Sequence, residues 1–390
     1  MRLSRVPRLF ALACALFASA TLGAPPAAAP ESRPEATAQM RATLGAVSGL
    51  QPYLAKAEAF GDPKNAERIR AFLDTLSRTE HAFPKGVPQE PGLAIVLGQF
   101  GSYLRQAQTE FRRGEHPQAR GRLQTVTSFC FACHTRLHLD KDFVDAGKQV
   151  DALMLPPLAR ADFLASTRQF EKALTLYGEV LAAATKDEAG YLDFQHALRR
   201  ALTIWVRVKG DAPQTVKLLG TLAKRDDLPE FIRSDVDERL VAARAWEKDR
   251  FKAAQATPQQ LIEKARTLTT STRATSALFL TGRDEVFLLR ASNLLHEALN
   301  KNPSTPLRAD ALYLLGASAA ALDDPTLWDL DRLYFETCIR ETAHTPAARR
   351  CFEAYRQRTV QGFTGSGGTR IPQDELTKLA ELRGLAQSGR

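Results

Sequence analysis

Residues 117–137 read PQARGRLQTVTSFCFACHTRL, and apolar side chains recur along them at three- and four-residue spacing. That spacing matches the turns of an α-helix, so the segment predicts an amphipathic helix that begins at Pro117. Gly114 ends the helix before it. The apolar face carries Ala119, Leu123, Val126, Cys130, Cys133 and Leu137. Two cysteines therefore belong to the stripe that this helix is expected to bury.

The end of the stretch, Cys130-Phe131-Ala132-Cys133-His134, has the pattern C-x-x-C-H, which attaches c-type haem. Two cysteines three residues apart on a helix present their sulfurs on one face and can form two thioether bonds. His134 follows directly and is expected to be the proximal iron ligand. The motif predicts one covalent haem c. A structural disulfide is one alternative, and a thioredoxin-like redox pair is another that lacks its βαβ setting.

Three further amphipathic helices precede this one, beginning at Thr37, Asp62 and Leu93. Each has roughly 20 residues, which is about 30 Å of helix. Helices of similar length with short connections are typical of an up-down-up-down bundle. We therefore expect an all-α protein whose residues 37–147 form a four-helix bundle that carries the haem.

A C-x-x-C-H motif late in the fourth helix of such a bundle resembles the class II cytochromes c, the family of cytochrome c-prime and cytochrome c-556. The resemblance covers residues 37–140 and includes the loop Phe83–Gly86 (FPKG) after the second helix. Members of that family often dimerise, so the resemblance also implies a homodimer. The family often has a basic residue four positions after the proximal histidine, and this chain has His138 there.

The sixth coordination position of the iron decides between electron transfer and gas binding. In an up-down bundle Met40, near the start of the first helix, lies at the level of Cys133, and Leu44 lies one turn later. The resemblance implies either a methionine ligand from the first helix or an apolar residue that leaves the iron five-coordinate. Met40 is thus the candidate distal ligand and Leu44 the candidate shield of an open iron. His81, at the end of the second helix, is a third candidate.

From about residue 153 the pattern is one of helical hairpins. One hairpin resembles a tetratricopeptide repeat in the order and spacing of Phe163, Phe170, Ala173 and Tyr177. Similar helix pairs recur with irregular periods at 188–225, 229–252 and 294–322. We expect a degenerate α-solenoid of tetratricopeptide-like hairpins over residues 148–361, with a generic α-solenoid as the alternative. Residues 362–390 are expected to form a flexible tail with a short helix.

Cys338 and Cys351 flank the turn His344-Thr345-Pro346, where one helix is expected to end and another to begin. Each cysteine lies about six residues from this turn. On two antiparallel helices they would face each other at one level, as a disulfide needs. The pattern predicts a Cys338–Cys351 disulfide.

The N-terminus has three arginines, then an apolar run at Leu9–Leu22, then a stretch rich in Ala and Pro. This order predicts a secretory signal peptide over residues 1–24, with cleavage near Ala20 or Ala24. A low-complexity linker at 25–36 follows. The signal peptide predicts a periplasmic or secreted protein. Haem c is attached outside the cytoplasm, so this location agrees with the motif. No later segment is apolar for long enough to span a membrane.

Together these patterns predict an exported monohaem electron carrier whose helical repeats dock a redox partner protein. One alternative is a five-coordinate haem that senses or scavenges NO or CO, and another is an interaction scaffold whose haem is structural. The net charge is +9, but the basic residues are spread along the sequence and form no Lys/Arg block. This argues against nucleic acid as a partner. An enzyme is not favoured, because a single haem is poorly equipped for multi-electron catalysis and no Ser/His/Asp triad, zinc motif or phosphate loop stands out.

Overall fold

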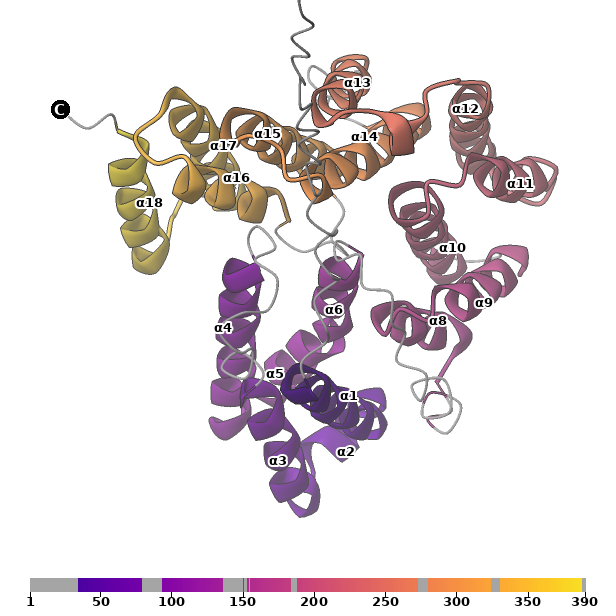
Figure 1. Ribbon diagram of the computed structural model, residues 1–390. Coiled ribbons are helices and arrows are strands. Elements are labelled where there is room, and N and C mark those ends of the chain that lie inside the picture. Colours follow the sequence, from indigo (N-terminus) through magenta and orange to yellow (C-terminus); the bar gives the residue numbers. More distant parts are fainter. Residues whose placement is uncertain are drawn as a thin grey trace, which may run out of the picture.

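The computed structural model describes residues 34–78, 93–135, 150, 153, 155–183, 188–272, 280–323 and 330–387. Nearly every element in these ranges is a helix, and their only strands form one two-stranded ribbon (Figure 1). The predicted all-α class is therefore confirmed. The signal peptide, the loop Phe83–Gly86, His81 and His138 lie outside the described residues.

The N-terminal helices are α1 (Pro34–Ala55), α2 (Ala57–Gly61), the 3-10 turn η1 (Pro63–Asn65), α3 (Ala66–Ser77), α4 (Leu93–Arg112), α5 (His116–Gln124) and α6 (Val126–His134). α1 packs against α3, α3 against α4, and α4 against α5. Their buried residues follow the helical stripes of the sequence and include Val47, Leu50, Ile69, Leu73, Leu76, Leu104 and Leu123. α1 begins at Pro34, so the last residues of the predicted linker 25–36 are helical.

The predicted fourth helix is not continuous, because it is broken at Thr125 into α5 and α6. The cause is a side chain from α4: the Tyr103 hydroxyl donates to the Arg122 carbonyl at 2.8 Å and lies 2.5 Å from Thr125 Oγ1. Helices kink where a side chain takes over part of the backbone hydrogen bonding. After the kink α6 packs chiefly against α8 (Pro157–Ser166), the first of the C-terminal helices.

The C-terminal helices after α8 are α9 (Phe170–Ala182), α10 (Glu188–Leu202), the π-helix η3 (Thr203–Val208), α11 (Ala212–Leu222), α12 (Glu230–Glu247), the 3-10 turn η4 (Ala253–Gln255), α13 (Pro258–Thr270), α14 (Gly282–Asn300), α15 (Thr305–Leu322), α16 (Leu330–Glu341), α17 (Pro346–Gly362) and α18 (Gln373–Ala386). Most neighbours in this order pack together, as α8 does with α9 and α15 with α16, whereas α12 packs against α11 and α14. Figure 1 shows them as an arch above the N-terminal helices, and α4 touches α16.

Sequence signals explain where several of these helices begin and how closely they pack. Thr257 and Thr345 accept hydrogen bonds from the first turns of α13 and α17, and a proline follows each of them directly. Gly316 lies where α15 approaches α16, and a Cβ there would come within 2.5 Å of the Phe335 ring. Glycine therefore sets the distance between these two helices.

The cysteine pair and the C-terminal segment complete this half. Cys338 on α16 and Cys351 on α17 form a disulfide with a Cα–Cα distance of 6.2 Å, which confirms that prediction. Of the expected tail, residues 362–390, the structure describes residues 362–387, which contain a short ribbon before the expected helix. Thr364–Gly365 (β1) pairs with Gly368–Thr369 (β2). α18 has 14 residues and packs on α16 and α17, where Glu375 binds Arg332 and Glu381 binds Arg340.

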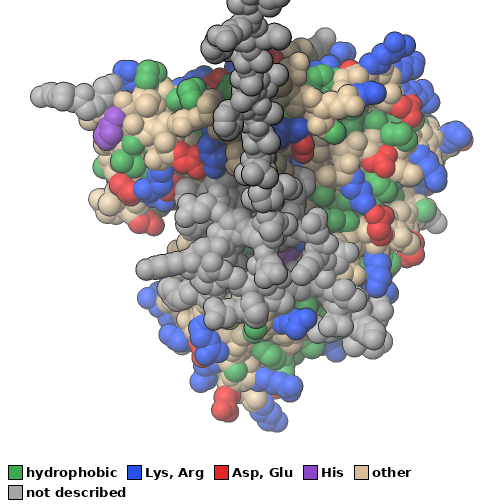
Figure 2. Space-filling model, viewed as in Figure 1, with side chains coloured by type: hydrophobic (Ala, Val, Ile, Leu, Met, Phe, Trp, Pro, Cys, Tyr) green, Lys and Arg blue, Asp and Glu red, His purple; other side chains and the backbone are tan. Residues whose placement is uncertain are grey.

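The distribution of charged side chains and the apolar length of the described helices bear on binding to nucleic acid and to membranes. On the face drawn in Figure 2, Lys and Arg side chains are interspersed with Asp and Glu. None of the helices in the described ranges is long and apolar enough to cross a membrane.

Candidate haem-binding site

The two cysteines of the motif lie on α6, one turn apart and half-buried. Neither forms a disulfide, and Cys130 Sγ lies 3.7 Å from the Val126 carbonyl one turn earlier. Burial, with a smaller contribution from Cys133, raises the pKa of the Cys130 thiol to about 12. A redox-active pair instead needs a cysteine with a lowered pKa. The site therefore does not favour the thioredoxin-like alternative.

His134 is the last residue of α6 and contacts the first C-terminal helix. Its Nδ1 lies 2.5 Å from the backbone carbonyl of Ser166, the last residue of α8. A carbonyl only accepts, so Nδ1 carries the proton and Nε2 keeps the lone pair. Desolvation, with a smaller contribution from the charge of Arg168, lowers the pKa of His134 to about 4 against the opposing effect of the hydrogen bond to the Ser166 carbonyl. The imidazole is neutral at physiological pH.

These groups fit haem c. Two thiols one turn apart on a helix are the groups that form its thioether bonds, and a neutral imidazole that donates from Nδ1 to a carbonyl is the usual form of a metal-bound histidine. The described residues contain no cluster of three or more His, Cys, Asp or Glu side chains that would hold a bare metal ion.

The opposite face of α6 meets a buried arginine from α10. The guanidinium carbon of Arg200 lies 4.0 Å from the centre of the Phe131 ring, inside the C-x-x-C-H motif. Arg200 Nη2 also donates to Ser128 Oγ at 3.2 Å. Only 2% of the Arg200 side chain is exposed. The sequence patterns did not single out Arg200. Its one sequence signal is its position among the apolar residues Ala197, Leu198, Ala201 and Leu202.

A second buried arginine, Arg207 on the π-helix η3, contacts the residue after His134. Its Nη1 donates to Thr135 Oγ1 at 3.3 Å, and its Nε and Nη2 donate to Ser292 and Tyr334. His296 Nε2 lies 3.0 Å from the Tyr334 hydroxyl. Single π-helical turns are frequent at functional sites. Helices α14 and α16 therefore reach the end of α6 through this polar cluster.

For the candidate sixth ligands that are described, the structure gives only their position on α1 and their burial. Met40 and Leu44 are half-buried on α1, which packs mainly against α3. His81 lies outside the described residues. Met40 as distal ligand and Leu44 as shield both remain predictions.

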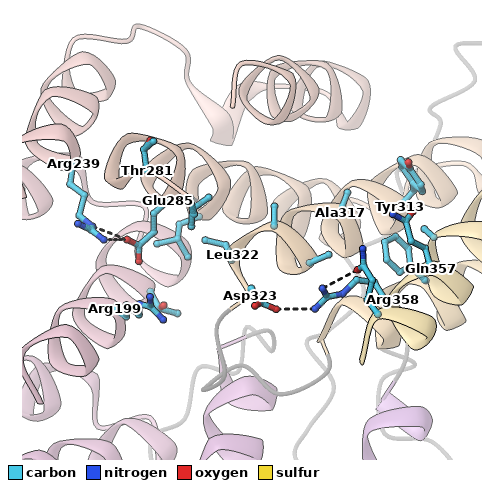
Figure 3. A pocket seen from close by; sticks show the side chains of 18 of the residues that line it. Arg199, Arg239, Thr281, Glu285, Tyr313, Ala317, Leu322, Asp323, Gln357 and Arg358 are labelled. Carbon is cyan, nitrogen blue, oxygen red and sulfur yellow. Dashed lines mark hydrogen bonds and ion pairs between the residues drawn. The ribbon is translucent and has the colours of Figure 1, made fainter. Parts of the chain in front are cut away.

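The C-terminal helices also enclose a cleft of about 800 Å³. Figure 3 shows that Arg239 faces Glu285 on one side and Arg358 faces Asp323 on the other, each as an ion pair. Arg199 of α10 lines the same cleft. Most of its charged side chains are thus already paired.

No family model, curated protein or solved structure matches the chain.

Proposed function

We propose that the chain is an exported c-type cytochrome that carries one covalent haem and transfers single electrons. Cys130 and Cys133 form the thioether bonds, and His134 binds the iron through Nε2. When bound, haem c supplies a one-electron couple. The C-terminal helices dock the redox partner protein.

The observation that carries this proposal is the hydrogen bond between His134 Nδ1 and the Ser166 carbonyl. It holds the imidazole in one tautomer and one orientation, which a ligand of fixed geometry requires and an ordinary surface histidine does not. The raised pKa of Cys130 keeps that thiol protonated in the chain without haem. Together these features favour attachment of a cofactor over thiol redox chemistry.

The finer architecture belongs to the same proposal. α1, α3, α4 and α5 with α6 form a four-helix bundle of the class II cytochrome type, interrupted at Thr125. The helices from α8 to α17 form a tetratricopeptide-like α-solenoid. The contact of α1 with α3 and the order α3, α4, α5 support the bundle. The paired packing of α8 with α9 and of α11 with α12 supports the solenoid.

The test is the mass of the full chain after export by cells that attach haem c. The expected result is a mass higher by one haem and a reduced-haem absorption spectrum. The double variant Cys130→Ser/Cys133→Ser should lose both. A chain that leaves such cells folded but without haem would refute the proposal.

The chain offers a matched control in its other cysteine pair. Cys338→Ser/Cys351→Ser removes the same number of cysteines, here the disulfide-bonded ones, far from His134 in the sequence. It should keep the haem if the folded protein is recovered. Loss of haem from this folded variant as well would contradict attachment at the motif.

A further inference from the structure

Arg200 is placed between the haem-bearing helix α6 and the first C-terminal helix α8. On the α6 side its guanidinium covers the Phe131 ring and donates to Ser128. On the α8 side its Nε lies 3.7 Å from Asp162 Oδ1. One buried side chain from α10 therefore contacts both helices that form the His134–Ser166 hydrogen bond.

Asp162 is itself held in place. It accepts from the Tyr177 hydroxyl at 2.6 Å, and His196 Nε2 lies 2.9 Å from its other oxygen. Although burial opposes it, the hydrogen bond from His196 and the charge of Arg200 lower the pKa of Asp162. Asp162 and Ser166 are four residues apart on α8 and thus on one face of that helix.

Arg200 is not explained by stability alone. Its Nε and Nη1 are buried and donate no hydrogen bond, and buried donors without an acceptor cost free energy. A buried ion pair such as Arg200–Asp162 can often be replaced as a pair by apolar side chains of similar volume without loss of stability, although removal of one partner alone is costly. A role at the neighbouring site explains its presence better than folding does.

We propose that Arg200 is a positioning residue that holds α6 against α8, so that the Ser166 carbonyl keeps the Nδ1 hydrogen bond of His134. The inference rests on the proposed function, because this hydrogen bond matters most when Nε2 binds iron. The planar fork of arginine contacts a ring, a hydroxyl and a carboxylate at once. Since α8 and α10 belong to the C-terminal helices, a partner that displaces them would act on the iron ligand through the same contacts.

The test follows exchange of the His134 Nδ1 proton with solvent, by NMR of haem-loaded full chain labelled with 15N-histidine. Arg200→Met keeps much of the volume and removes the polar contacts, and exchange should become about tenfold faster. The reduction potential should shift in the same variant. Arg199→Met is the matched control, since Arg199 is the neighbouring residue but lines the cleft. It should change neither quantity.

Arg200→Lys distinguishes positioning from charge. Lysine keeps the cation but lacks the planar fork, so its exchange should also be fast. Exchange at the wild-type rate in Arg200→Lys would overturn the positioning role, and so would wild-type exchange in a folded Arg200→Met. If Arg200→Met does not fold, Arg200→Lys alone decides. Failure of the proposed function is recognised separately, because the wild-type mass then shows no haem.

Discussion

His134 donates a hydrogen bond from α6, the last of the N-terminal helices, to a backbone carbonyl of α8, the first of the C-terminal helices. The acceptor lies in the last turn of α8, where backbone carbonyls lose their partners within the helix and carry partial negative charge. Such an acceptor strengthens the bond and raises the electron density of the imidazole. The residue that the motif identifies is therefore tuned by residues that the motif does not contain.

The proposed role of Met40 as distal iron ligand predicts how the haem responds to CO. With Met40 as distal ligand, the reduced haem protein should be low-spin and its absorption spectrum should not change with CO. Met40→Ala should open the iron and produce a CO complex. Leu44→Ala, one turn away on α1, is the control and should leave the CO response unchanged. A wild-type protein that is high-spin and binds CO would contradict this and favour the gas-binding alternative.

Two glycines of the C-terminal helices have different surroundings, and one disulfide joins two of these helices. Gly316 allows α15 to approach the Phe335 ring of α16. Gly178, inside α9, has open space around the position of a Cβ. The disulfide joins α16 and α17 across a sequence separation of 13 residues. The surroundings of the two glycines predict opposite effects on stability when each is replaced by alanine.

Gly316→Ala should lower the free energy of unfolding by about 1–3 kcal/mol, because the new methyl group displaces a packed ring. Gly178→Ala should instead raise it by up to about 1 kcal/mol, because alanine costs less conformational entropy in a helix. Urea unfolding of both variants checks this. Equal effects of the two substitutions would show that the α15–α16 distance does not limit packing.

Removal of the disulfide by Cys338→Ser/Cys351→Ser should cost about 3 kcal/mol, because the unfolded chain regains the entropy of an open loop. Denaturant unfolding of this variant and of the wild type, without reductant, measures the difference. The same loss should follow when the wild type is unfolded with reductant. Unchanged stability in the reduced wild type would contradict the prediction.

In the molecule as a whole, Asp162 is a titratable group at the junction between the N-terminal helices and the C-terminal helices. Asp162 connects α8 with α9 and α10 through Tyr177 and His196, and with α6 through Arg200. Its pKa is lowered in the folded protein. Stability from this carboxylate is therefore present above its usual pKa, about 3.9, and is lost as the pH falls toward the lowered value.

Asp162→Asn should consequently be less stable than the wild type at pH 6, and the difference should shrink as the pH falls below about 4. Denaturant unfolding of both proteins between pH 6 and pH 3 measures it. A difference that stays constant over this range would show that Asp162 does not stabilise the junction as an anion.

The sequence determined the elements that depend on local pattern. Apolar spacing predicted the all-α class, the cysteine positions around one turn predicted the Cys338–Cys351 disulfide, and the C-x-x-C-H motif located the candidate haem site. Each of these signals lies within a few turns of helix. The hairpin at Phe163 and Tyr177 also formed as two helices, α8 and α9.

Only the tertiary structure decided what surrounds the site. The kink at Thr125 comes from Tyr103. The partners of α6 include Ser166, 32 residues from His134, and Arg200, 72 residues from Ser128. Contacts over such distances leave no periodic trace in the chain, because a backbone carbonyl has no sequence signature and a buried arginine resembles a surface one. Local pattern identified the groups proposed to bind haem, and long-range packing determined how they are held.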